Sequence, residues 1–300
     1  MAVHKNSLKN HRPPLVVLVG PTASGKTALA VKLAKKLNGE IISADSRAVY
    51  RYLDIGVAKP TLGERQGVPH WGMDLVNPGE RFSVADFQRY ANRKIDQIRR
   101  RGGVPFLVGG SGLYVDAVIF NYTLVGGLDY NLERKKYSDM SLEQLWEYCH
   151  KNNILLPENW KNKRYVINTI VRNGKSFLRR SRVIDNCVVF GVKTDVDVLK
   201  ARIDARAEAM FSGGVIEEAT RVAELFGWDN EAMTGNVYPI VRQYLDEKIT
   251  LSQAIQMFKQ SDWRLVKRQL TWFKRNTAID WVDLPDAESK IIQKVSNMLI

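Results

Sequence analysis

The sequence has 300 residues, of which 45% are hydrophobic and 26% charged. This composition is too apolar for a disordered chain, and the length suffices to bury the core of one large domain or two smaller ones. Forty-five Lys and Arg residues against 32 Asp and Glu leave a formal charge of +13, which an acidic small-molecule substrate alone does not explain. The excess predicts a polyanionic partner, with nucleic acid first and a membrane surface second.

The number of cysteines and the lengths of the apolar runs indicate the cellular compartment in which we expect the protein. Cys149 and Cys187 are the only cysteines and form no CxxC pair, so the chain alone builds neither a disulfide framework nor a structural zinc site. No apolar run approaches the ~18 residues that span a bilayer, and residues 1–14 lack the apolar stretch of a secretory signal. We expect a protein of the reducing cytoplasm that has no membrane span.

The first 120 residues alternate between short apolar runs and amphipathic segments. The runs predict strands at 15–19, 40–43 and 106–108, and the amphipathic segments predict helices at 27–37 and 84–101. Ser83 is the expected N-cap of the second helix, and Gly102-Gly103 ends it. This alternation is typical of a parallel sheet wrapped by helices.

The composition changes between Phe120 and Ser181, where apolar strands stop and Lys, Arg, Asn and Tyr accumulate around helical stretches such as 141–151. A strand at 188–192 and an amphipathic helix at 195–211 then resume the earlier pattern, and the periodicity of the remainder is mostly helical. We therefore predict a core domain of residues 1–119 and 182–300, interrupted by a helical insertion domain at 120–181.

The sharpest motif is a G-x-x-x-x-G-K-[ST] match between the first predicted strand and the first predicted helix. Its residues are Gly20, Pro21, Thr22, Ala23, Ser24, Gly25, Lys26 and Thr27. In this context the backbone N–H groups and the helix N-terminus attract a diphosphate or triphosphate, the lysine adds a point charge, and the threonine hydroxyl can ligate Mg²⁺. The expected fold is therefore α/β, a P-loop NTPase-like parallel sheet core flanked by helices, with a helical insertion domain.

The phosphate compound is not specified by the loop. No apolar strand ends in the Asp that an NTPase needs, because the strand at 106–108 runs into Gly109-Gly110-Ser111-Gly112-Leu113-Tyr114. This turn leaves room for a ligand near the backbone and offers the Ser111 hydroxyl, although simple turn chemistry also explains the glycines.

Asp45 follows the second predicted strand, on the edge of the sheet where α/β proteins bind ligands. There its carboxylate could ligate Mg²⁺ or accept a proton from a nucleophile. The alternative is that Asp45 or Ser46 only caps a following helix.

These pieces, taken together in order along nearly the whole chain, resemble the tRNA dimethylallyltransferase family, which prenylates the adenine beside the anticodon. The matching segments are Gly20–Thr27, Asp45-Ser46 with Tyr50, Asp54–Pro60, Gly67–His70, Phe82–Phe87, Gly109–Tyr114, Leu199–Gly214 and Lys267–Phe273. The resemblance implies that the P-loop holds the diphosphate of dimethylallyl diphosphate, with Mg²⁺ at Thr27, and that ATP is not the substrate. It also implies that Asp45 is the base for the adenine N6, that Ser111 stands near the leaving diphosphate where relatives have Thr, and that Arg206 is a diphosphate ligand.

The same resemblance implies that the insertion grips the anticodon stem-loop of tRNA. We expect tRNA contacts at and beside Asp45, at Ser111, and in the insertion and two basic segments, 161–182 and 263–275. The expected tRNA-binding residues are Asp45, Ser46, Arg47, Ala48, Ser111, Arg134, Lys161, Lys163, Arg164, Lys267, Arg268, Gln269, Thr271, Trp272 and Lys274. For each basic segment the alternative is a solvated helix face, and for Trp272 and Phe273 it is a buried helical stripe.

Several positions depart from the family pattern. Ala48 stands where many members have Gln, and Asn168 replaces an expected Arg. Asn236-Val237-Tyr238-Pro239 stands where the family has Ile-Gly-Tyr-Lys, and Asp262-Trp263 where Thr-Arg is usual. These departures cluster in the half expected to face RNA and spare the diphosphate half.

The rival functions are a small-molecule kinase or NTPase, a catalytically inactive RNA-binding homologue, and an isopentenyltransferase that acts on free adenine nucleotides. Retention of Lys26, Thr27 and Asp45 disfavours the inactive homologue, and the basic segments disfavour a mononucleotide acceptor. We expect a monomer.

Overall fold

The computed structural model describes residues 12–123, 133–172 and 180–299. The chain divides into two compact units, the first of residues 1–119 and 182–300 and the second of residues 120–181. In the described part of the chain, no helix combines the length and the apolar character needed to cross a membrane.

The first unit is built on a six-stranded, all-parallel sheet with the strand order β3-β2-β4-β1-β5-β6. The strands are β1 Leu15–Val19, β2 Gly39–Ser43, β3 His70–Trp71, β4 Val104–Gly109, β5 Cys187–Lys193 and β6 Ile279–Asp283. All five residues of β1 are fully buried because the strand has a neighbour on each side and helices over both faces. Since the sheet is parallel, the loops that follow β1, β2, β4 and β5 meet at one edge.

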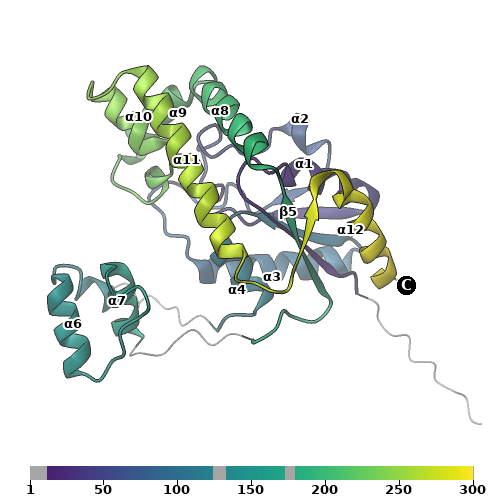
Figure 1. The fold of residues 1–300 in the computed structure, drawn as a ribbon, viewed down its shortest axis with the longest axis horizontal. Coiled ribbons are helices and arrows are strands. Elements are labelled where there is room, and N and C mark those ends of the chain that lie inside the picture. The colour runs from purple at the N-terminus through teal and green to yellow at the C-terminus, as the bar shows by residue number, and fades with distance from the viewer. Residues whose placement is uncertain (1–11, 124–132, 173–179, 300) are drawn as a thin grey trace, which may run out of the picture. The chain divides into compact units, whose positions relative to one another are not determined.

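Two helix pairs cover the sheet of the first unit, α1 with α12 and α3 with α4 (Figure 1). A further group, α8 to α11, lies beyond the end of β5 (Figure 1). The helices of this unit are α1 Lys26–Lys36, α2 Leu62–Arg65, α3 Val84–Arg100, α4 Gly112–Ile119, α8 Val196–Ser212, α9 Val215–Phe226, η1 Ala232–Thr234, α10 Tyr238–Leu245, α11 Leu251–Phe273 and α12 Leu284–Leu299.

The core under α1 and α12 explains why the sequence folds this way. Leu29 and Leu33 of α1 and Ile291 of α12 pack on Val16 and Phe106 of the sheet, and all five are buried. The predicted stripe of α8 is likewise buried at Leu199, Ile203 and Met210. Ser83 caps α3 as predicted, accepting from the Asp86 N–H while the Asp86 carboxylate accepts from the Ser83 N–H at 2.9 Å.

The second unit is helical where it is described. It contains α6 Leu142–Lys151, which begins after the N-cap Ser141, and α7 Lys163–Val171. The buried side chains of these helices form a separate core with Ile154: Leu145, Cys149, Val166, Ile167 and Ile170. Its aromatic residues pack as T-shaped pairs, Tyr137 with Tyr148 and Trp146 with Trp160.

The remainder of the chain after residue 211 is mostly helical as predicted, with one strand that was not predicted. Residues 279–283 form β6, which pairs in parallel with β5 alone and lies at the edge of the sheet. Ile279 and Val282 are buried and Trp281 is half-buried, but Asp280 and Asp283 are exposed, so the segment lacks the continuous apolar run of the inner strands. The two-residue β3 on the opposite edge was also not predicted.

Candidate active site

Three loops that leave the carboxyl edge of the sheet bring the predicted catalytic residues together. The P-loop follows β1, Asp45 follows β2, and Ser111 follows β4. The loops are joined directly, since the Ala44 N–H donates to the Val108 carbonyl at 2.7 Å and the Ser111 N–H donates to the Ala44 carbonyl at 3.2 Å. Backbone hydrogen bonds therefore hold the loops of residues 45 and 111 next to each other, although the two residues are far apart in the sequence.

The P-loop curls as the motif predicts. Ala23 and Gly25 have φ of 61° and 86°, and Gly25 is the N-cap of α1 without a side-chain hydrogen bond to the helix. The first N–H groups of α1 therefore have no carbonyl partner within the helix, and no acidic residue lies in its first turn. An anion placed there meets backbone donors and the positive end of the helix dipole.

Lys26 is the cation of this loop. Its ammonium donates to the Pro21 carbonyl at 3.0 Å. The pKa of Lys26 is lowered to about 8, chiefly by burial and in smaller part by the positive charge of Arg206, while the charges of Asp45 and Asp262 act in the opposite direction. A bound diphosphate would restore the lysine charge because it brings negative charge to the same place.

Asp45 both caps a turn and keeps one carboxylate oxygen available. Its Oδ1 accepts hydrogen bonds from the N–H groups of Arg47 at 2.8 Å and Ala48 at 3.4 Å, so part of the structural alternative holds. Among the described residues, no donor contacts Oδ2. The turn fixes the direction of the carboxylate, which is what a general base requires.

Ser111 lies against Ser46 and precedes α4. Its hydroxyl accepts from the Ser46 N–H at 3.0 Å and donates to the Ser46 hydroxyl at 3.3 Å. The Ser111 carbonyl accepts from the N–H groups of Tyr114 and Val115, which begins the helix. The hydroxyl is therefore oriented by the loop that carries Asp45.

The glycines around Ser111 are explained by close packing, since none of the three has a positive φ. A Cβ on Gly109 would lie 2.1 Å from the Ala44 carbonyl oxygen, and one on Gly112 would lie 2.2 Å from Trp272 Cδ1. The space beside Gly112 that the sequence assigned to a ligand is occupied by a side chain of this protein.

Arg206 of α8 reaches the P-loop, where its Nη1 hydrogen-bonds to the Thr22 hydroxyl. Arg202, one helical turn earlier, donates to the Ala23 carbonyl at 3.1 Å. Sequence reasoning assigned Arg206 a role and missed Arg202. The i, i+4 spacing of two arginines on a predicted helix was the available signal, because it places both on one face.

Gln269 of α11 joins two of the loops. Its Oε1 accepts from the Thr22 N–H at 2.9 Å, and its Nε2 donates to the Gly110 carbonyl at 3.1 Å. Both ends of the amide are engaged within the protein, although the sequence placed Gln269 among the tRNA contacts.

The other residues of the basic segment 263–275 divide between two faces of α11. Phe273 is 1% exposed, and Trp272 is half-buried with its Nε1 donating to Asp116 at 2.8 Å. Thr271 is exposed, and its hydroxyl donates to the Lys267 carbonyl. The exposed cations are Arg264, Lys267 and Arg268 on the helix and Lys274 and Arg275 after its end. The structural and the functional interpretation of this segment are therefore compatible.

Arg47 and Ala48 lie beside Asp45 in different environments. The guanidinium of Arg47 donates to the Glu231 carbonyl. The side chain of Ala48 is buried, and its backbone N–H donates a hydrogen bond to Asp45. A contact between RNA and this turn would therefore have to come from the residues next to Ala48.

In the second unit the predicted contact residues also differ in exposure. Lys161 and Arg164 are exposed, and the Lys161 ammonium lies 5.0 Å from the Trp160 ring centroid. Lys163 is half-buried and donates to the Ser138 carbonyl at 2.6 Å, and Arg134 is half-buried as well. Lys175 and Arg179 of the basic run lie outside the described residues.

The chemistry of the donor set fits Mg²⁺ only in company with a bound diphosphate. Thr27 offers an exposed hydroxyl oxygen, the hard ligand that Mg²⁺ prefers. Among residues 12–123, 133–172 and 180–299, no three His, Cys, Asp or Glu side chains gather to hold a metal. The metal would therefore take most of its ligands from phosphate oxygens and water.

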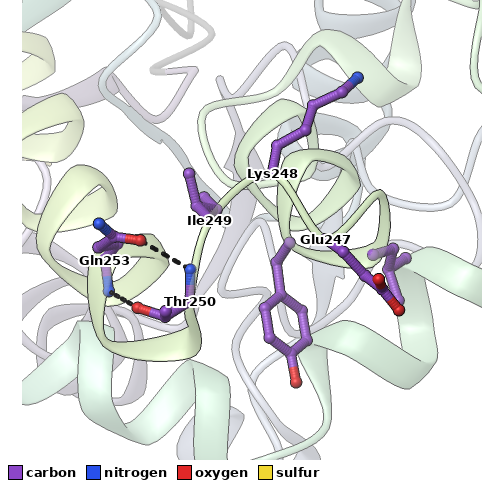
Figure 2. A pocket seen from close by; sticks show the side chains of 7 residues that line it. Glu247, Lys248, Ile249, Thr250 and Gln253 are labelled. Carbon is purple, nitrogen blue, oxygen red and sulfur yellow. Dashed lines mark hydrogen bonds between the residues drawn. The ribbon is translucent and has the colours of Figure 1, made fainter.

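The described part of the first unit contains several hollows, two of which differ in their relation to the P-loop. One, of about 810 Å³, adjoins the P-loop at Pro21 on the β5–β6 side and is lined mainly by apolar residues that include Leu199, Leu270 and Trp281. Figure 2 shows the other, of about 430 Å³, at the turn between α10 and α11, where Thr250 and Gln253 form the hydrogen bonds that begin α11. No P-loop residue lines the second hollow.

The chain matches two family profiles, IPP transferase over residues 48–276 and isopentenyl transferase over residues 13–72. It is 37% identical over 291 residues to a tRNA dimethylallyltransferase of Bacillus velezensis, covering 92% of this chain and 93% of that protein. It is 38% identical over 302 residues to the tRNA dimethylallyltransferase of Halalkalibacterium halodurans, covering 95% and 96%.

Solved structures give the same result. The tRNA isopentenylpyrophosphate transferase of Bacillus halodurans superposes with a TM-score of 0.74 at 37% identity, covering 96% of this chain and 97% of that one. A eukaryotic dimethylallyltransferase acting on tRNA has a TM-score of 0.78 at 22% identity, which supports the fold. From these matches over nearly its full length, the chain belongs to the tRNA dimethylallyltransferase, or IPP transferase, family.

Proposed function

We propose that the protein transfers the dimethylallyl group of dimethylallyl diphosphate to N6 of the adenine adjacent to the anticodon, position 37, in tRNA, releasing diphosphate. The relatives named above are transferases acting on tRNA, and the observation that carries the assignment to this chain is the site itself. A P-loop with Lys26 and Arg206 lies on one side, and Asp45, with a free carboxylate oxygen, lies on the loop that is bonded to Ser111.

The donor half of the reaction needs stabilisation of the leaving diphosphate. The N–H groups at the start of α1, the Lys26 ammonium and the Arg206 guanidinium supply positive charge that is fixed before the reaction begins. Removal of one such preorganised donor commonly costs about 3 kcal/mol of transition-state stabilisation. Mg²⁺ held by the Thr27 hydroxyl and the diphosphate oxygens would neutralise further negative charge.

The acceptor half needs a base, because an exocyclic adenine amine is a weak nucleophile. In this proposal Asp45 Oδ2 accepts the N6 proton while Oδ1 stays bonded to the turn of residues 45–48. In the same proposal the Ser111 hydroxyl, which is hydrogen-bonded to Ser46, stands near the leaving diphosphate. The target base must leave its stack to reach Asp45, which costs a few kcal/mol and less in a loop than in a duplex.

Binding of the anticodon stem-loop would offset that cost. In this proposal backbone phosphates are bound by the exposed cations Lys161 and Arg164 of the second unit, by Lys267 and Arg268 of α11, and by Lys274 at the end of that helix. The enzyme would act as a monomer in the cytoplasm.

The test is incubation of the protein with unmodified tRNA, Mg²⁺ and either dimethylallyl diphosphate or ATP, followed by mass analysis of the nucleosides. The proposal predicts that a prenylated adenosine forms in the reaction with dimethylallyl diphosphate and does not form in the reaction with ATP. Phosphate release from ATP without a prenylated nucleoside would favour the kinase or NTPase alternative, and tRNA binding without any product would favour an inactive homologue.

A further inference from the structure

A cluster of three polar residues, Asp262, Asn236 and Ser261, lies next to Arg206, the arginine of α8 that hydrogen-bonds to the P-loop. Asp262 of α11 is 1% exposed, and its Oδ1 accepts from the Asn236 side-chain amide at 3.3 Å. Asn236 in turn accepts from the Ser261 hydroxyl at 3.3 Å. The cluster has no part in the proposed reaction, yet it puts a buried carboxylate beside the diphosphate site.

The carboxylate is only half satisfied. Asp262 Oδ2 is buried and accepts no hydrogen bond within the described residues, and its nearest cation is Arg206, with Nη1 at 3.8 Å. A charge-assisted hydrogen bond between such groups is about 2.7–2.9 Å long, so the ion pair stands one small side-chain movement short of closure. Since an unpaired buried carboxylate is unfavourable, Asp262 attracts this guanidinium.

Arg206 is shared between two positions. Its Nη1 hydrogen-bonds to Thr22 in the P-loop, whereas its Nε is buried and finds no acceptor among the described residues. Arg206 therefore has a donor left over for a further hydrogen bond. Its guanidinium lies near two groups that can attract it, an anion bound in the P-loop and the carboxylate of Asp262. A diphosphate and Asp262 would draw the same cation in different directions.

Two departures from the family pattern meet in this cluster. In the resemblance described above, Asp262 stands at a Thr position and Asn236 at an Ile position, and in this structure the two side chains are hydrogen-bonded to each other. An isoleucine could not supply that donor. The chain therefore carries a buried carboxylate together with the amide that supports it.

We propose that Asp262 is a positioning residue that competes with bound diphosphate for Arg206, so that it holds the guanidinium in the empty site and weakens retention of the diphosphate product. The charge of Asp262 is felt within the P-loop, because it raises the pKa of Lys26 while Arg206 lowers it. This inference rests on the proposed function, in which the P-loop binds a diphosphate.

The experiment is direct titration of inorganic diphosphate, with Mg²⁺ and without tRNA, into the full-length protein and three variants. Asp262→Asn removes the charge and keeps an acceptor for Asn236, and Asp262→Thr installs the residue usual in relatives. Asp204→Asn, an exposed carboxylate on the same helix as Arg206, is the matched control. Product inhibition by diphosphate and the donor KM are measured in parallel.

Both Asp262 variants are expected to bind diphosphate on the order of tenfold more tightly than the wild type, with a lower donor KM, stronger product inhibition and an unchanged tRNA KM. Asp204→Asn should not change these values. A purely structural role would lower melting temperature and activity without any gain in affinity, so diphosphate affinity that is equal or weaker in folded Asp262→Asn or Asp262→Thr overturns the inference. If the wild type itself binds no diphosphate, the proposed donor site fails instead.

Discussion

The side-chain oxygen of Gln269 accepts a hydrogen bond from the backbone N–H of Thr22 at 2.9 Å. The amide nitrogen of the same side chain donates to the Gly110 carbonyl. One residue of α11 thus fixes the distance between the P-loop and the loop that carries Ser111. In the proposed reaction those loops hold the diphosphate and the group beside it, so α11 sets the geometry of the donor site as well as presenting cations to solvent.

Replacement of Gln269 by Glu should weaken this bridge. The carboxylate can still accept from Thr22, but it loses the donor for Gly110 and places negative charge against a carbonyl. We expect a loss of about 1–3 kcal/mol in the free energy of unfolding, measured by urea denaturation, and a higher donor KM. Gln260→Glu, exposed on the same helix, should stay within about 0.5 kcal/mol of the wild type. Equal effects of the two substitutions would contradict a bridging role.

Asp45→Asn should lower turnover about 10²- to 10⁴-fold while tRNA affinity changes little. The asparagine oxygen can still accept from the N–H of Arg47, so the turn and the melting temperature should be preserved. Single-turnover rates and filter binding of tRNA give the two quantities. Asp96→Asn, an exposed carboxylate on α3, is the control that should leave both unchanged. Parallel losses of turnover and tRNA affinity in Asp45→Asn would refute its role as the base.

The lowered pKa of Lys26, about 8, predicts a pH-dependent donor affinity. Below pH 8 the ammonium is protonated and attracts the diphosphate. Above pH 8 the empty site loses this proton, so binding must take a proton up, and the donor KM should rise by up to about tenfold per pH unit. Lys26→Arg keeps its charge throughout this range, and its profile should be flat. A flat wild-type profile between pH 7 and pH 9.5 would show that Lys26 does not titrate in the empty site.

The exposed cations on α11 should appear in the salt dependence of tRNA binding. Each phosphate contact that is removed lowers the slope of log affinity against log salt concentration by about 0.7–0.9. We expect Lys267→Gln and Arg268→Gln each to reduce the slope by that amount. Lys294→Gln, exposed on α12, should leave it unchanged. Slopes that are the same in all three variants would remove α11 from the RNA-binding surface.

The inner strands and the P-loop could be predicted from sequence because their signals are local. β1 and β4 are continuous apolar runs, β2 carries the buried pair Ile41-Ile42, and Gly20–Thr27 places its strand, turn and helix within a few residues. β6 escaped prediction because exposed Asp280 and Asp283 interrupt its apolar residues, so that this short edge strand resembles an exposed segment.

Contacts between distant segments could not be predicted. Gln269 and Trp272 lie in a segment rich in cations. The sequence alone therefore does not show that these two side chains contact the loop at Gly110 and Gly112 instead of RNA. The partner of Arg206 was hidden for the same reason. Asp262 is distant in the sequence and meets Arg206 only through the packing of α8 on α11.

The central claim is that a prenyl group passes from a P-loop-bound diphosphate to adenine N6 beside an anticodon. The most direct measurement uses two anticodon stem-loop RNAs, one with adenine and one with guanine at position 37, together with free adenosine monophosphate as a third acceptor. Each is incubated with the protein, Mg²⁺ and dimethylallyl diphosphate, and the products are mapped by mass spectrometry of nuclease digests. The account predicts one dimethylallyl group on the adenine-37 RNA and none on the other two acceptors. Prenylation of the guanine RNA or of the free nucleotide, or no prenylation of the adenine RNA, would contradict it.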